Sequence, residues 1–190
     1  MPPKVKTTKR DIIKAATELV RTSGAAAINA RAIARMLGSS TQPIFSNFED
    51  MEKVRDAVIG EARRLYSGYV EREIESKKYP IYKASGMGYI RFASEEPELF
   101  RLLYMRDRSG IDREHEDDEI WRGIIDTVRE VTGLSDENSQ LFHIEMWMIV
   151  HGIATAIATG YLDIGEELIS KMITDAYQGL RSRFGLGGQG

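Results

Sequence analysis

The chain has 190 residues, of which 42% are hydrophobic and 29% charged, and its formal net charge is −3. The absence of cysteine excludes disulfides and thiolate metal sites. No apolar run approaches the roughly 20 residues of a membrane span, and the charged N-terminus lacks the apolar core of a signal peptide. We therefore expect a soluble, cytoplasmic protein with no membrane partner, folded as one small domain and one larger domain.

Almost every segment carries the apolar periodicity of a helix, with few alternating β-branched runs and no Asn-Gly turns, so the expected fold class is all-α. The helical patterns end at proline, glycine or capping residues. The predicted helices span about 8–23, 30–37, 41–47, 50–77, 81–95, 97–107, 112–132, 136–160 and 164–184. The glycine-rich stretch 185–190 has no side chains to bury, and we expect it to be a disordered tail.

The second and third predicted helices meet at Gly38 with the spacing of a helix-turn-helix. Ile33 and Leu37 lie one turn apart on the first of these helices, and Ile44 and Phe48 form the matching face of the second. Gly38 can take the positive φ that such a turn needs. Since tight helical corners also occur in proteins that bind no DNA, the spacing alone leaves both interpretations open.

Capping residues set the boundaries of these short helices. Asn29 is expected to cap the first, and Ser39 or Ser40 the second. Pro43 falls in the first turn of the second helix, where its missing N–H costs little. Asp50 is positioned to cap the long fourth helix.

The second helix of a helix-turn-helix lies in the major groove of DNA. Glutamine and asparagine can pair with adenine there, and apolar groups can rest against a thymine methyl. An arginine at the start of the first helix can contact a phosphate or a guanine. The candidate DNA-binding residues are Arg31, Ser40, Thr41, Gln42, Pro43, Phe45, Ser46 and Asn47, with Lys4, Lys6 and Lys9 of the N-terminal arm.

Charge is distributed unevenly along the chain. Residues 1–55 contain ten Lys or Arg and five Asp or Glu, a balance of +5, whereas residues 56–190 carry −8. A basic end on an acidic body is typical of a phosphate-binding module attached to another domain, although Lys4 to Arg10 alone would also fit a solubility tail. We expect a DNA-binding domain at 1–55 and a second domain at 56–184.

Residues 8 to about 60 resemble the DNA-binding domain of the TetR/AcrR family of transcriptional regulators. The resemblance includes a glycine stop at Gly24, the helix-turn-helix, the pair Phe45 and Phe48 before a capped fourth helix, and an apolar first-helix face made of Ile12, Ala15, Ala16, Leu19 and Val20. It implies a TetR-like architecture of nine helices in two domains, with a three-helix N-terminal head and a C-terminal helical body. By the same likeness, the DNA-binding domain at 1–55 is linked through a long helix to about residue 77, and 56–184 is a ligand-binding and dimerisation domain. It also implies a transcriptional regulator, usually a repressor.

The sequence departs from the family pattern within the head. Phe45 stands where family members usually carry a tyrosine that contacts a phosphate, and Asn47 where a histidine or tyrosine is common. The customary lysine is missing around Met51. Since Thr41, Gln42 and Pro43 also differ from the common Lys-Gly-Thr, no operator sequence can be carried over. These three residues and Asn47 are expected to do the reading.

The helix predicted at 136–160 is apolar around most of its circumference, so it must be buried on more than one side. Packing against a second copy of the chain would provide this burial, and a central core helix in a monomer is the alternative. Trp147, His151 and Gly152 resemble the W-x-x-x-H-G signature of one TetR C-terminal subclass, over roughly 80–184, which implies a four-helix dimer interface. The expected interface residues are Ile149, Ile153, Ala156, Ile157, Ile169, Met172, Ile173 and Ala176.

Large aromatic residues and adaptable methionines recur on the helices expected to surround the centre of the body. An apolar pocket with a few polar groups could bind a small-molecule effector there, although ordinary core packing explains each residue singly. The candidate ligand-binding residues are Tyr66, Phe92, Leu103, Tyr104, Trp121, Phe142, Met146, Trp147 and His151.

Catalysis has little support in the sequence. The three histidines, His115, His143 and His151, sit in no nucleophile or metal motif, and the last two are too far apart on one helix to chelate a single metal. The acidic run Asp112 to Glu119 is interpreted as a solvated helix start. We expect no enzyme activity, cofactor or metal.

The expected function is therefore that of a ligand-responsive regulator that binds a pseudo-palindromic double-stranded DNA operator as a homodimer and is released by an apolar or aromatic small molecule. The alternative is a non-enzymatic, helical protein-interaction module with a degenerate DNA-binding head.

Overall fold

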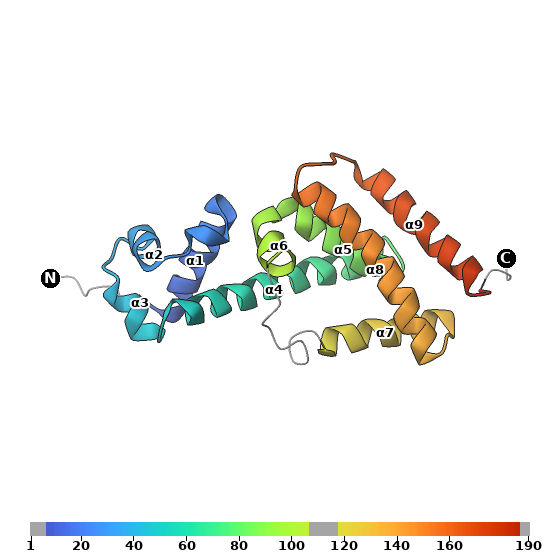
Figure 1. The fold of residues 1–190 in the computed structure, drawn as a ribbon, viewed down its shortest axis with the longest axis horizontal. Helices are drawn as coiled ribbons and strands as arrows, with labels where there is room; N and C mark the ends of the chain where they lie inside the picture. Colours follow the sequence, from blue (N-terminus) through green and yellow to red (C-terminus); the bar gives the residue numbers. More distant parts are fainter. Residues whose placement is uncertain (1–6, 107–117, 187–190) are drawn as a thin grey trace. The chain divides into compact units, whose positions relative to one another are not determined.

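The computed structural model describes residues 7–106 and 118–186, with side chains from 122 onward in the second range. This part of the chain is helical and contains no strand, which confirms the predicted all-α fold (Figure 1). The elements are α1 (Lys9–Ser23), the 3₁₀ turn η1 (Ala25–Ala27), α2 (Ala30–Met36), α3 (Gln42–Asn47), α4 (Met51–Glu75), α5 (Ile81–Glu95), α6 (Pro97–Tyr104), α7 (Asp118–Thr132), α8 (Asp136–Ala158) and α9 (Glu166–Arg183).

These bounds agree with the predicted ranges except at a few ends. The sixth helix stops at Tyr104 rather than 107, and the described part of the seventh begins at Asp118. The predicted start at 112, the candidates Lys4 and Lys6, and the tail from 187 lie outside the described residues.

The helices group into two compact units. Unit 1 comprises Met1–Ser67 and Glu96–Arg106, and unit 2 comprises Gly68–Glu95 and Asp107–Gly190. The division falls within α4, about twelve residues beyond the end of the predicted DNA-binding domain. The first unit therefore holds α6 as well as the N-terminal helices.

In unit 1, α1 begins with a capping box. The backbone N–H of Thr8 donates to Asp11 at 2.9 Å and the Asp11 N–H donates to the Thr8 hydroxyl at 3.2 Å. The side-chain and backbone hydrogen bonds from Thr8 lower the pKa of Asp11. The helix buries Ile12 and Val20 and ends at Gly24, whose φ of +75° needs a residue without a Cβ.

The corner between α2 and α3 forms largely as predicted. Asn29 caps α2 by accepting from the Ala32 N–H at 2.9 Å, and Gly38 takes a φ of +60° in the turn. The predicted cap of α3 is wrong: Thr41, rather than Ser39 or Ser40, is its N-cap residue and makes no side-chain capping bond. Its helical backbone, with φ −76° and ψ −12°, differs from the extended conformation of a side-chain cap.

Helix α6 belongs to the N-terminal unit, which the sequence analysis did not predict. It packs against α1 and η1. Arg21 of α1 donates to both carboxylate oxygens of Glu96, at 2.8 and 2.6 Å, directly before α6. A Cβ at Gly24 would lie 3.2 Å from Glu98 Oε2, so the chain also approaches α6 closely there.

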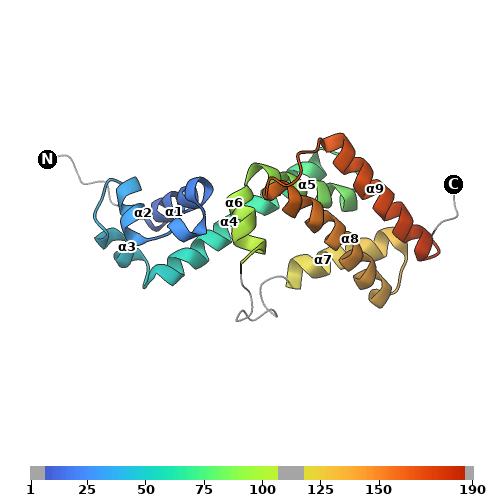
Figure 2. The ribbon, with the colours of Figure 1, turned by 45° about the horizontal axis from the view of Figure 1, so that its top comes forward.

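In unit 2, α8 contacts α5, α7 and α9 and lies between α7 and α9 (Figure 2). A Cβ at Gly88 of α5 would lie 2.7 Å from the Cα of Val70 on α4, so the close crossing of these helices requires glycine. The buried carboxylate of Glu73 pairs with Arg91 at 2.5 Å, and Arg91 also pairs with Glu166 at 3.3 Å. These ion pairs tie together α4, α5 and the start of α9.

Helix α8 is long and apolar enough to cross a membrane by length and composition alone, with a mean hydropathy of 1.4. The expectation was that no apolar run approaches the length of a span, and polar residues do interrupt the apolar ones in this helix. The finding is weak evidence for a membrane span, because the core helix of a soluble protein passes the same test. Three other helices of unit 2 pack against α8.

Candidate nucleic-acid interface

The two sides of α3 differ sharply in exposure. Ile44 and Phe48 are buried against the rest of unit 1, whereas Gln42, Phe45 and Ser46 are exposed on the other side. At 100° per residue Gln42 and Ser46 lie across the helix from the buried pair, and Phe45 lies on the flank between the two sides. The outer face of α3, which we define as Gln42, Phe45 and Ser46, is therefore the part of this helix available to a partner.

Several polar side chains at this corner hydrogen-bond the nearby backbone. Asn47 Nδ2 donates to the Pro43 carbonyl at 2.7 Å, and the Ser46 hydroxyl donates to the Gln42 carbonyl at 3.0 Å. The Ser39 hydroxyl donates to the Ser40 carbonyl at 3.0 Å. Among the described residues Gln42 makes no side-chain hydrogen bond, so its exposed amide group is not engaged within the protein.

The predicted reading residues are thus not equivalent. Thr41, Pro43 and Asn47 are half-buried, and Asn47 has one donor already engaged. Gln42, Phe45 and Ser46 are the exposed members on α3. The structure brings Ser40 and Thr41 to the same corner, where the Ser40 side chain is exposed.

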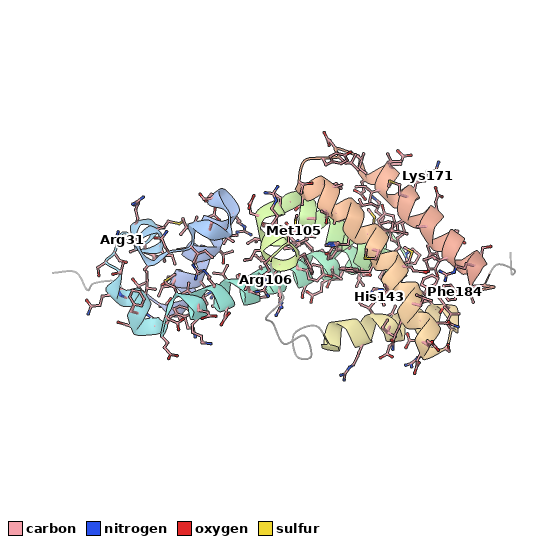
Figure 3. All side chains as sticks on the ribbon, viewed as in Figure 1. Arg31, Met105, Arg106, His143, Lys171 and Phe184 are labelled. Atoms are coloured by element: carbon pink, nitrogen blue, oxygen red, sulfur yellow. The ribbon has the colours of Figure 1, made fainter. Side chains whose placement is uncertain are left out.

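The unit that contains this corner also exposes several basic side chains, on α1 and α2. Arg10, Lys14, Arg31 and Arg35 are exposed and form no ion pair with any residue that the structure describes. Figure 3 labels Arg31 on α2. The ammonium of Lys9 lies 4.9 Å from the centroid of the Phe48 ring, which ties the start of α1 to the end of α3. Unpaired cations on the surface of one unit favour binding of a polyanion.

The residues of the predicted ligand set fall into two groups, one in each unit. Tyr66, Leu103 and Tyr104 belong to unit 1, where the two tyrosine rings meet edge to face at 6.3 Å. The members in unit 2 are Phe92, Phe142, Met146, Trp147 and His151. The side chain of Trp121 lies outside those described. The structure therefore does not gather the set into one site within either unit.

In unit 2, two histidines of α8 each bind a tyrosine of α5. Nδ1 of His151 lies 2.8 Å from the hydroxyl of Tyr89, and the His151 ring stacks on Trp147 at 4.7 Å. Nδ1 of His143 lies 3.0 Å from the hydroxyl of Tyr82. Burial lowers the pKa of His143 to about 4, lowers that of His151, and raises that of Tyr82.

His143, which the predicted ligand set did not include, is buried on α8. It lies one helical turn before Trp147 and two turns before His151, so the helical spacing of the sequence could have grouped the three residues. Figure 3 labels His143 together with Phe184. The ring of Phe184 lies 5.7 Å from that of Phe142.

The predicted dimer residues on α8 and α9 also divide by exposure. Ile153, Ile169 and Ile173 are buried within the protomer, whereas Ile149 and Met172 are exposed and the alanines and Ile157 are half-buried. Further exposed apolar side chains, which the sequence analysis did not name, extend the same helices: Leu141, Ile144, Met148 and Leu168. Their spacing of three or four residues on each helix would have identified them.

No group of three or more His, Asp or Glu side chains able to hold a metal occurs among the described residues. The features of the site are therefore a short helix with an exposed face, cations without an ion pair in the same unit, and a second helical unit with exposed apolar side chains. Together with the fold, they define the class: an all-α protein with an N-terminal helix-turn-helix head.

Comparison with known families identifies the class more closely. Residues 82–176, half of the chain, match the model of the tetracyclin repressor-like C-terminal domain. The chain therefore belongs to the TetR family, as the resemblance of its N-terminal segment predicted. The W-x-x-x-H-G subclass stays a prediction. None of the curated proteins matches the sequence.

Solved structures share the fold at low sequence identity. A protein of unknown function from Rhodococcus sp. RHA1 is 20% identical with a TM-score of 0.68, covering 94% of this chain and 95% of the other. A TetR-like transcriptional regulator from the same organism is 14% identical with a TM-score of 0.67 and coverages of 99% and 100%. A putative TetR-family regulator from Vibrio parahaemolyticus is 14% identical, with a TM-score of 0.63 and coverages of 90% and 96%. This chain has the fold of a TetR-family transcriptional regulator.

Proposed function

We propose that the protein is a ligand-responsive repressor of transcription that binds a pseudo-palindromic operator as a homodimer and leaves it when an apolar or aromatic small molecule binds the body. The observation that carries the proposal is the outer face of α3, which presents the unengaged amide of Gln42 among unpaired cations such as Arg31 and Arg35. A helix with this exposure fits the major groove, and the arginines suit the flanking phosphates.

The apolar surface of the body supports the homodimer. We define the α8–α9 face as Ile144, Met148, Ile149, Leu168 and Met172, all more than a third exposed. Exposed apolar side chains at helical spacing on two adjacent helices favour a second copy of the same surface, which a two-fold axis would supply. Two heads held in this way would meet major grooves one helical turn, about 34 Å, apart.

The junction between α5 and α6 supports a response to an effector. The Tyr69 hydroxyl donates to Glu95, the last residue of α5, at 2.9 Å within unit 2. The next residue, Glu96, is held by Arg21 within unit 1. Glu95 and Glu96 are consecutive in the chain, but the carboxylate of Glu95 contacts a residue of unit 2 and that of Glu96 a residue of unit 1. An effector that moves α5 would pull on the contacts of α6 with α1, which changes the head and its affinity for DNA.

The proposal includes no catalytic activity, cofactor or metal. We expect a regulator that acts on a DNA operator to be located in the cytoplasm. Repression, rather than activation, follows the usual mode of the family to which the chain belongs.

The test is selection and sequencing of genomic DNA fragments by the purified protein, followed by a salt titration of binding to the selected fragment. A shared palindrome and a steep linear fall of log K with log salt are expected, because each phosphate contact releases counterions. Absence of DNA binding at low salt would favour the alternative of a protein-interaction module. A selected site without two-fold symmetry would contradict the dimer.

A single substitution tests base readout within the same experiment. Gln42→Ala should weaken binding by about 1 to 3 kcal/mol at particular base pairs of the operator. Because Gln42 is exposed and unengaged, the fold should not change. An equal loss on every DNA sequence would show that Gln42 contacts only the backbone.

A further inference from the structure

The outer face of α3 combines an amide with a large apolar ring. The Phe45 side chain is 51% exposed, and its ring contacts no other aromatic ring among the described residues. Phe45 follows Gln42 by three positions, so the two side chains are neighbours on the helix surface. An exposed phenyl group costs hydration free energy unless a partner covers it.

The core of unit 1 does not require this ring. Ile44 and Phe48 fill the inner side of α3 and are almost completely buried, while Phe45 lies on the flank of the helix and is half exposed. Phe45 cannot donate a hydrogen bond, so it gains nothing from a phosphate oxygen. In the major groove the apolar group available to it is the 5-methyl of thymine.

The other exposed side chain of this face does not compete for the same role. The Ser46 hydroxyl uses its one donor on the Gln42 carbonyl at 3.0 Å. The face therefore offers one free amide, from Gln42, and one apolar contact, from Phe45. Adenine recognition through N6 and N7 and thymine recognition through the methyl are the two base contacts that match this pair.

We propose that Phe45 is a specificity-determining residue that packs against a thymine 5-methyl in each operator half-site, beside an adenine read by Gln42. This inference rests on the proposed DNA-binding function. It identifies the partner more narrowly: a half-site in which an A·T step lies under the outer face of α3, recognised in part by a methyl group rather than by hydrogen bonds.

The experiment uses the selected operator synthesised with uracil in place of thymine, one pair of symmetry-related positions at a time. Uracil lacks only the 5-methyl and keeps base pairing. At one such pair of positions the affinity of the full chain should fall by about fifteenfold. Each of the two half-sites contributes about fourfold, the value expected for one buried methylene. Phe45→Ala should bind the thymine and uracil duplexes equally.

Two further variants separate methyl readout from loss of fold. Phe45→Leu keeps an apolar side chain and should retain part of the thymine preference, with an unchanged thermal midpoint by circular dichroism. Met36→Ala removes another half-exposed apolar side chain of the head, outside α3, and should keep the full preference.

The outcomes distinguish the inference from the proposed function. Equal binding of the wild-type protein to thymine and uracil at every position, or a preference that persists in Phe45→Ala, would overturn the role of Phe45 while DNA binding stands. Failure of the wild-type protein to bind any DNA at low salt would overturn the proposed function, and the inference with it.

Discussion

At the scale of single residues, buried polar groups of the body determine how its stability depends on pH. His143 is 6% exposed and faces the hydroxyl and the ring of Tyr82. Since burial lowers its pKa to about 4, from an ordinary value of 6.5, the imidazole is neutral in the folded state at neutral pH.

We predict that this histidine destabilises the fold in mild acid. Below pH 6.5 the unfolded chain binds a proton that the folded chain excludes, so the stability contributed at neutral pH declines as the pH falls from about 6.5 to 4. The decline attributable to His143 is at most about 3 kcal/mol. Chemical denaturation of the wild type and of His143→Gln across this range measures it. Parallel curves for the two proteins would contradict the prediction.

A second residue-scale prediction concerns the crossing of α4 and α5. In Gly88→Ala the new methyl would meet the backbone of Val70 at 2.7 Å, so the helices must separate. We expect a loss of about 1 to 3 kcal/mol in the free energy of unfolding, the usual cost of overpacking.

The matched control is Gly60→Ala, a helical glycine of α4 whose Cβ would meet no atom within 4 Å. It should be stabilising by up to about 1 kcal/mol, because alanine has the higher helix propensity. Thermal unfolding followed by circular dichroism compares the two. Equal shifts for both variants would mean that the close approach at Gly88 carries no cost.

At the scale of elements, the assignment of α6 to the N-terminal unit is the feature most relevant to regulation. Its amphipathic sequence buries Leu99 and Phe100, and the paired Arg21 and Glu96 hold its start to α1. The carboxylate of Glu96 is only 13% exposed, so this ion pair is better shielded from solvent than a surface pair.

A double-mutant cycle on Arg21→Gln and Glu96→Gln tests this link. We expect a coupling energy of about 1 kcal/mol in unfolding, as for other bidentate, partly buried pairs. The control is Arg64 and Glu61, a bidentate pair within α4 whose arginine is largely exposed, where the coupling should be smaller. If the two cycles gave the same coupling, the Arg21 pair would not contribute specifically to anchoring α6.

At the scale of the whole molecule, the proposed function depends on assembly. The α8–α9 face leaves Met148 58% exposed, although methionine is usually a buried residue. Covering this face by a second copy would explain why α8 is apolar on more than one side, since α5 and α7 already cover the others.

We predict that Met148→Glu disrupts the homodimer and lowers operator affinity by more than tenfold, because the second head no longer binds with the first. Val131→Glu is the control, since Val131 is 48% exposed on α7 and lies outside the α8–α9 face. Sedimentation velocity gives the oligomeric state, and titration of the operator gives affinity. A wild-type protein that sediments as a monomer, or a dimeric Met148→Glu, would refute the interface.

Local signals in the sequence determined the helices and the head. Periodicity and caps act over one or two turns, so Asn29, Gly38 and Asp50 could be assigned from neighbouring residues, and the structure agrees with each. The family was also identifiable, because its head motifs have fixed offsets along the chain. The cap of α3 was predicted wrongly, since serine at either position satisfies the same local rule.

Only the tertiary structure decided which of those residues are exposed, which are buried and which contact one another. Arg21 and Glu96 form an ion pair although they are 75 positions apart in the chain. Neither this pair nor the packing of α6 on α1 can be predicted from a local pattern. The same holds for Ile153, whose helical spacing suits either a protomer core or an interface. For α3, composition predicted a set of DNA-reading residues, and packing within unit 1 left Gln42, Phe45 and Ser46 exposed. Exposure is a property of the folded surface, because every side chain of an unfolded chain is exposed.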